Sequence, residues 1–162
     1  MGLRVEALDR AADLSDPAGQ RRLYSLMVGL LADVPFGEPV TPWPFEVWRE
    51  RLLGSEDFDP GGVFLLLTPA GEWAGVTELY RPHPSGPRTL HQGLTGVSAG
   101  QRGLGAAWLL KLAAARRARE RGFDFVKTNN HTRNAAMLGV NDGMGFVRGR
   151  ATVMLLRREG ER

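Results

Sequence analysis

The sequence predicts a mixed α+β domain with antiparallel strands early in the chain and a β-α-β unit late. Two strand-like runs, at residues 63–68 and 73–80, are joined by the turn PAGE, which indicates an antiparallel hairpin. A third strand at 89–97 is followed by a glycine-rich turn, a helix and another apolar run at 123–127. We therefore expect a central mixed, mostly antiparallel sheet flanked by helices.

The first half of the chain supplies a short strand and two helices ahead of this hairpin. Residues 5–14 fit an opening strand and its exit. The next helix, over 16–34, has Pro17 near its start and leucines at helical spacing. Four prolines then interrupt residues 35–44, which predicts a loop, and a second short helix follows over 45–54.

The second half ends the β-α-β unit and adds one more helix. The helix after the glycine turn is expected to run to about Arg121, before Gly122. Thr132 is expected to cap a short helix, and residues 146–158 are expected to supply closing strand material. No repeat or linker divides the chain, so residues 1–162 are expected to form a single domain.

The composition limits the chemistry that this chain can carry out. Its 162 residues are 43% apolar and 24% charged, as in ordinary globular proteins. It has no cysteine, and its 3 histidines lack metal-ligand spacing, so disulfides and metal catalysis are not expected. No apolar run approaches the roughly 18 residues of a membrane span, and the N-terminus lacks a signal-peptide centre. A cytoplasmic protein without a membrane partner is expected.

The charge distribution favours an anionic ligand. Lys and Arg exceed Asp and Glu by 21 − 18 = 3, and the excess lies after Arg102. A local positive field of this kind attracts anions. The basic residues are not interleaved with aromatic ones and no nucleic-acid-binding motif is present, so nucleic acid is not the expected partner.

The stretch LTGVSAGQRGLGAAWLLK, residues 94–111, has the features of a phosphate-binding turn. Glycines permit backbone conformations that direct several N–H groups to one point, and the following helix adds its unpaired N–H groups and positive dipole end. The turn lacks the Lys-Ser or Lys-Thr of a P-loop, and it ends in Trp108 where a dinucleotide-binding turn needs a small residue. A plain structural turn is the remaining alternative.

The same stretch resembles the acetyl-CoA signature of the GCN5-related N-acetyltransferase (GNAT) superfamily, through Arg102, Gly105 and Ala107. The resemblance implies that the fourth and fifth strands splay apart and that acetyl-CoA lies between them. The pantetheine arm would pair with the backbone of Val97, Ser98 and Ala99. The diphosphate would lie on the amides of Arg102, Gly103, Leu104, Gly105, Ala106 and Ala107.

A second stretch, TNNHTRNAAMLGVNDGMGF, resembles the second signature of that superfamily, and its spelling is similar to the mycothiol synthase-like branch. Asn134 and Asn141 share one helical stripe with Met137 and Leu138. Asn134 is expected to hydrogen-bond the pantetheine arm, because a buried amide without a partner is costly. For Asn141 a cofactor contact and a structural role remain equally open.

The catalytic groups are less clear from the sequence. His91, taken to be in phase with Thr95 and Val97, occupies the strand position where family members often carry a base, and Glu78 on the preceding strand is the rival. Asn141 replaces the tyrosine that often acts as general acid. That role would pass to Tyr24, Tyr80 or solvent, and the Val97 or Ser98 N–H would polarise the thioester.

The predicted function is acetyl transfer from acetyl-CoA to a primary amine of a small molecule or peptide, by direct attack. A non-catalytic acyl-CoA-binding or regulatory domain is the alternative. Asp33, Glu38, Glu46 and Glu50, in or beside the proline-rich loop, could attract an amine, but the sequence does not identify the acceptor. It also leaves a homodimer open.

Overall fold

The computed structural model describes residues 2–35, 40–80 and 86–151. Its five strands form one sheet in the order β1-β2-β3-β4-β5. Every pair is antiparallel except β4 with β5, which is parallel. The strands are β1 (Arg4–Ala7), β2 (Val63–Leu67), β3 (Trp73–Tyr80), β4 (Thr89–Val97) and β5 (Phe125–Thr128).

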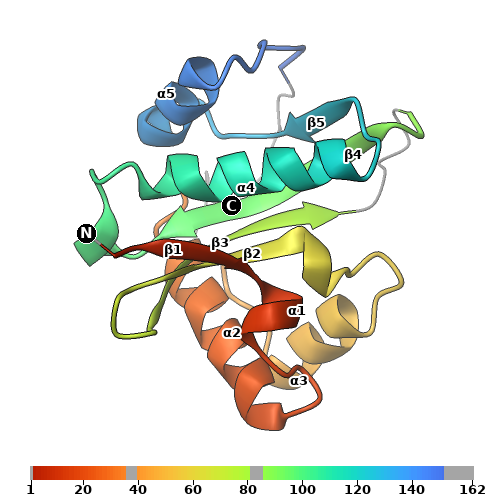
Figure 1. Cartoon of the computed structure of the whole chain (residues 1–162), viewed down its shortest axis with the longest axis vertical. Helices are drawn as coiled ribbons and strands as arrows, with labels where there is room; N and C mark the ends of the chain where they lie inside the picture. The colour runs from red at the N-terminus through yellow and green to blue at the C-terminus, as the bar shows by residue number, and fades with distance from the viewer. Residues whose placement is uncertain (1, 36–39, 81–85, 152–162) are drawn as a thin grey trace, which may run out of the picture.

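Helices cover both faces of this sheet. Figure 1 shows α4 along one face and α1, α2 and α3 on the other, with α5 beyond β5. The α-helices are α1 (Leu8–Ala11), α2 (Pro17–Leu31), α3 (Phe45–Trp48), α4 (Ala106–Glu120) and α5 (Ala135–Gly143). The shorter helices are η1 (Arg49–Leu53), η2 (Pro60–Gly62) and η3 (Ala99–Gln101).

Each face of the sheet has its own apolar core. Alternate residues of the strands point to opposite faces, so β2 contributes Phe64 and Leu66 to the α4 side and Leu65 to the α2 side. Leu110 of α4 and Leu23 of α2 are fully buried against these two faces. The sheet is thus sandwiched between two helical layers, as the sequence predicts.

The predicted helix starts are confirmed for α2 and wrong for α5. Asp16 caps α2 by accepting a 3.0 Å hydrogen bond from the Ala18 N–H, with Pro17 in the first turn. At α5 the cap is Asn134, because its side chain accepts from the Met137 N–H at 3.2 Å, and Thr132 lies before the helix.

The predicted closing strand over 146–158 is only partly testable. Residues 146–151 form no regular secondary structure, and residues 152–158 lie outside the described part of the chain. Within the described ranges, no helix is long and apolar enough to cross a membrane.

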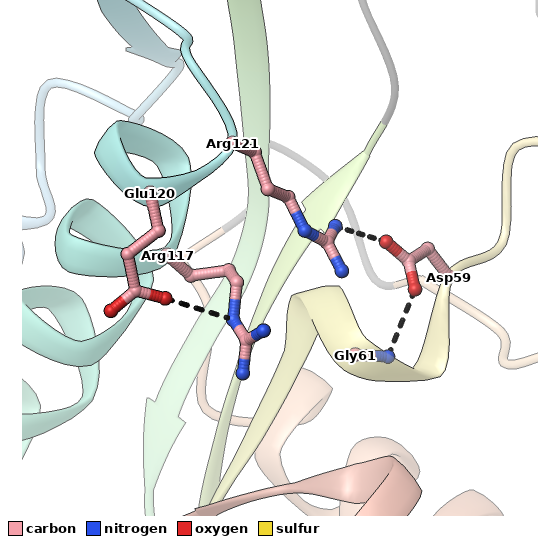
Figure 2. A network of polar contacts seen from close by, with 5 residues as sticks. All are labelled: Asp59, Gly61, Arg117, Glu120 and Arg121. Atoms are coloured by element: carbon pink, nitrogen blue, oxygen red, sulfur yellow. Dashed lines mark hydrogen bonds and ion pairs between the residues drawn. The ribbon is translucent and has the colours of Figure 1, made fainter.

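The end of α4 is anchored to the segment before β2 by the contacts in Figure 2. The Asp59 carboxylate accepts a 2.9 Å hydrogen bond from the Gly61 N–H, which caps η2, and it also pairs with the guanidinium of Arg121. Arg117, one turn earlier, lies 3.8 Å from Glu120. The Asp59–Arg121 pair therefore joins the C-terminal end of α4 to the segment before β2.

Candidate active site

The parallel strands β4 and β5 part halfway along β4. β5 pairs only with Thr89–Gln92, so the rest of β4 has an outer edge with no strand partner among the described residues. The Ser98 N–H donates to the Ala74 carbonyl of β3 at 2.8 Å. Because successive residues of a strand direct their backbone groups to alternate sides, the N–H and C=O of Val97 point away from β3. This splayed edge offers hydrogen bonds to an extended ligand.

The N-terminus of α4 opens onto the same edge. Gly103 and Gly105 both have φ of +74°, a left-handed conformation that favours glycine. Gly105 is the N-cap residue of the helix, and in the described structure no side chain caps its first turn. The free N–H groups of that turn and the helix dipole therefore favour an anion at this point.

A cavity of about 390 Å³ connects the splayed edge, the glycine turn and α5. We call it the turn cavity. Seven of the predicted cofactor residues line it, namely Val97, Arg102, Gly103, Gly105, Ala106, Ala107 and Asn134. Ser98, Ala99, Leu104 and Asn141 do not line it. The Ser98 N–H donates to β3, so of the two expected thioester donors the Val97 N–H is the one that points away from the sheet, and the role of Ser98 stays a prediction.

Arg102 makes two contacts at the mouth of the turn cavity. Its Nε donates to the Val97 carbonyl at 2.9 Å, and its guanidinium pairs with the carboxylate of Asp33, which follows α2. Both side chains of this ion pair are about half exposed. The sequence indicated Arg102 but not its partner, because the pairing joins residues far apart in the chain.

The two predicted amides of α5 have local roles. Asn134 caps α5 through its Oδ1 and lines the turn cavity, and its contact with a cofactor stays a prediction. Asn141 is buried, and its Nδ2 donates to Asn130 Oδ1 at 2.6 Å. The Asn141 Oδ1 has no hydrogen-bond partner among the described residues.

A β-bulge in β4 changes which face His91 occupies. Thr77 of β3 pairs with Thr95 of β4, and Leu79 of β3 pairs with Gln92 of β4. Between these two pairs, β4 has one more residue than β3. The extra residue reverses the alternation of side chains along β4. His91 therefore lies on the α2 face while Thr95 lies on the α4 face, and the expected common phase is wrong.

The bulge also creates a close polar contact around Glu78. The Leu94 N–H donates to Glu78 Oε2 at 3.1 Å, and the Tyr80 hydroxyl is a second hydrogen-bond partner of that carboxyl. A Cβ on Gly93 would lie 2.3 Å from Cε2 of Tyr80, so only glycine fits beside this ring. The His91 ring stacks on Tyr80 with centroids 6.5 Å apart. Both predicted catalytic residues are thus brought together around Tyr80.

Burial makes the Glu78 carboxyl a weaker acid than usual. Glu78 is only 3% exposed. Desolvation raises the pKa of Glu78 from 4.5 to about 7, against the opposing effect of its hydrogen bonds to Tyr80 and Leu94. Burial and the neighbouring Glu78 carboxyl raise the pKa of Tyr80 above its ordinary value. A carboxyl of this acidity suits proton transfer near neutral pH.

A second cavity of about 680 Å³ lies over Glu78, between α2, the segment 40–52 and strands β3 and β4. We call it the aromatic cavity. The two cavities share no described lining residue, but residues adjacent in sequence line them: Leu94 and Leu31 line the aromatic cavity, and Thr95 and Leu30 line the turn cavity. Both cavities therefore lie along the same parts of β4 and α2.

Lys111 of α4 was not singled out by sequence analysis. It is only 2% exposed, its ammonium donates to Gln92 Oε1, and it lies 4.9 Å from the centroid of the Phe146 ring. Gln92 Nε2 in turn donates to Thr77 Oγ1 at 3.0 Å. Desolvation lowers the pKa of Lys111 from 10.5 to about 8. The sequence signal for its burial was its position on the helix face that carries the small buried residues of α4.

The residues described contain no group of three or more His, Cys, Asp or Glu side chains that could hold a metal ion. The sequence matches no protein-family model and no curated protein.

Solved structures, by contrast, match over almost the whole chain. AAC(6')-Iy in complex with the bisubstrate analog CoA-S-monomethyl-acetylneamine has a TM-score of 0.68 at 13% identity, covering 98% of this chain and 99% of that one. The NatC complex bound to Gag peptide and CoA has a TM-score of 0.66 at 20% identity, covering 93% and 87%. An aminoglycoside acetyltransferase, meta-AAC0020 from an uncultured soil metagenomic sample, in complex with trehalose, has a TM-score of 0.64 at 12% identity, covering 98% and 96%. The chain therefore has the fold of the GNAT acetyltransferases.

Proposed function

We propose that this chain, which has a GNAT fold, transfers the acetyl group of acetyl-CoA to a primary amine by direct attack. One observation carries the proposal: residues adjacent in sequence on β4 and on α2 line the turn cavity and the aromatic cavity, and the second of these holds the buried Glu78. A binding domain needs the turn cavity alone. A second cavity with a carboxyl of pKa about 7 is what a two-substrate transferase requires.

The turn cavity suits coenzyme A in two ways. The diphosphate would accept hydrogen bonds from the first N–H groups of α4, beyond Gly103 and Gly105. The amide-rich pantetheine arm would donate to the outward carbonyl of Val97, which has a second lone pair beside the one that accepts from Arg102. Arg102 would add a positive charge on release from Asp33. Two of the solved structures of similar fold contain CoA or a CoA conjugate, which supports this choice of ligand.

Acetyl transfer needs a neutral amine and a polarised thioester. In the proposal Glu78 accepts a proton from the ammonium form of the acceptor, and the freed nitrogen attacks the thioester carbonyl carbon. A carbon–nitrogen bond forms, the carbon–sulfur bond breaks, and CoA leaves as a thiolate. The attacking nitrogen loses its remaining excess proton in this step, and that proton reaches the thiolate through the Tyr80 hydroxyl or through solvent. His91, stacked on Tyr80, is the alternative base. The chain contains no cysteine, so no cysteinyl intermediate is required.

Polarisation of the thioester falls to Val97 in this scheme. Its N–H points toward the turn cavity, whereas the Ser98 N–H is bonded to β3. A backbone donor fixed in a strand needs no reorganisation as negative charge develops on the carbonyl oxygen. The sequence similarity to the mycothiol synthase-like branch stays a prediction.

The test combines binding with product analysis. Calorimetry is expected to detect acetyl-CoA binding, and an amine panel is expected to yield free CoA together with an acetylated product by mass spectrometry. Gly105→Asp should abolish binding, because it places a carboxylate at the proposed phosphate site. Gly122→Asp is the matched control, since Gly122 has φ of +80° but lies at the other end of α4.

Two results would contradict the proposal. Folded protein that binds no acetyl-CoA excludes it outright. Binding without transfer to any amine favours the alternative of a non-catalytic acyl-CoA-binding domain.

A further inference from the structure

Most of the described residues that line the aromatic cavity are apolar. Glu78 is the only carboxylate among the described residues that line it, and Arg51 is the only cation. The other lining residues are Tyr24, Met27, Val28, Leu31, Val40, Thr41, Pro42, Trp43, Trp48, Leu52, Tyr80 and Leu94. Ligand cavities with apolar walls and few polar groups bind the ligand body by burial and fix its orientation at the polar groups.

Contacts among its aromatic residues hold one wall in place. The Tyr24 ring makes edge contacts with Trp48 at 5.3 Å and with Phe45 at 5.4 Å between centroids. The Tyr24 hydroxyl donates to the Trp43 carbonyl at 2.7 Å, which ties the segment before α3 to α2. A wall that is ordered before binding reduces the entropy cost of receiving an apolar ligand.

The charges of this cavity match one ammonium group. Glu78 is buried at the strands, whereas the Arg51 guanidinium lies 4.9 Å from the centroid of the Trp43 ring. A second ammonium on the ligand would have no carboxylate to approach among the described lining residues, and Arg51 would repel it. Removing such a charge from water without a partner is costly.

We infer that the acceptor is a monoamine whose primary amine is attached to an aromatic or branched apolar body, with the amine at Glu78 and the body against Trp43 and Trp48. This inference rests on the proposed acetyl transfer and names its substrate class. Polyamines and aminoglycosides are poor acceptors in this view, even though a similar solved structure is an aminoglycoside acetyltransferase.

The experiment measures kcat/KM for four acceptors at saturating acetyl-CoA. The probes are 2-phenylethylamine, isoamylamine, spermidine and kanamycin, and each acetylated product is identified by mass. The two apolar monoamines are expected to be preferred by at least about tenfold, the factor that corresponds to about 1.4 kcal/mol of additional apolar and aromatic contact. Equal or higher values for spermidine or kanamycin overturn the inference and leave acetyl transfer intact.

Two variants test the residues that carry the inference. Trp43→Ala should lower kcat/KM for 2-phenylethylamine by about tenfold with an unchanged Kd for acetyl-CoA. Phe125→Ala is its matched control, because Phe125 is 67% exposed and lines neither cavity. Val40→Glu adds a second carboxylate to an exposed lining position and should raise kcat/KM for spermidine about two- to fivefold, relative to Val40→Gln.

The outcomes separate the two proposals. Bound acetyl-CoA without acetylation of any of the four probes overturns the acceptor class, whereas acetyl transfer itself is overturned only when the wider amine panel also yields no acetylated product. If the apolar amines are acetylated equally well by the wild type and by Trp43→Ala, the aromatic cavity is not the acceptor site. Acetyl transfer itself then still stands.

Discussion

Replacing Glu78 with glutamine should remove a large pH dependence of stability. The pKa of Glu78 is 4.5 in an ordinary environment and about 7 in the fold. The folded state therefore holds this proton more tightly, and its contribution is fully present below pH 4.5 and is lost as the pH rises through 7. Each pKa unit corresponds to about 1.4 kcal/mol, so the free energy of unfolding falls by about 3 kcal/mol across this window.

The measurement is urea denaturation followed by tryptophan fluorescence at several pH values from 4.5 to 7.5. Glutamine can still accept hydrogen bonds from the Leu94 N–H and from Tyr80, so Glu78→Gln should fold. The wild type is expected to lose about 3 kcal/mol relative to this variant across the range. Glu72→Gln, at an exposed residue of the turn before β3, is the control and should keep the wild-type slope.

Parallel pH curves for the wild type and Glu78→Gln would refute this reasoning, because they would show that the carboxyl is ionised at its ordinary pKa. Lys111 has a pKa of about 8 and titrates above the window.

Three further predictions concern other parts of the molecule. Because the folded pKa of Lys111 is lowered to about 8, the unfolded state binds more protons at higher pH, and stability should rise by about 1–2 kcal/mol between pH 8 and 9.5 in denaturant titrations. Gly93→Ala should cost about 1–3 kcal/mol in thermal unfolding, because its Cβ would lie 2.3 Å from the Tyr80 ring. Asp33→Asn should tighten acetyl-CoA binding about two- to tenfold in calorimetry, because Arg102 is freed and a negative charge near the proposed diphosphate site is removed.

Each of these has a control and a contradicting result. The Lys111 slope should vanish in Lys111→Met, and a slope that persists would assign the titration to another group. Gly100→Ala has open space at its Cβ and no left-handed φ, so it should be nearly neutral; an equal loss in both alanine variants would exclude the Tyr80 contact. Weaker acetyl-CoA binding by Asp33→Asn would indicate that the ion pair organises the turn cavity.

Local patterns predicted most of the elements, because each depends on nearby residues. The strand 89–97 and the helix that ends before Gly122 match β4 and α4. The left-handed glycines of the turn were also predictable, since their backbone conformation is closed to most other residues. Thr132 was a reasonable cap by residue type, but Asn134 is the residue at the geometric start of α5.

The errors at the site have a tertiary origin. Simple alternation placed His91 on the wrong face, because the bulge opposite Glu78 is specified by a pairing between two strands. Lys111 is buried because Gln92 of β4 accepts from its ammonium, a contact that no local pattern contains. The aromatic cavity combines three distant segments, so only the fold brings its walls together.

The two cavities draw on different parts of the chain. The wall of the aromatic cavity comes mainly from residues 24–31 and 40–52, whereas the turn cavity uses mainly residues 95–108 and 134–140. Glu78, on a central strand, belongs to neither group of segments. Residues 40–52 line the aromatic cavity but not the turn cavity, so under the proposed function their mutation would alter acceptor preference without changing the lining of the proposed acetyl-CoA site. Under the proposed function, exchanging residues 40–52 between proteins of this fold would change which amine is acetylated by replacing a single segment.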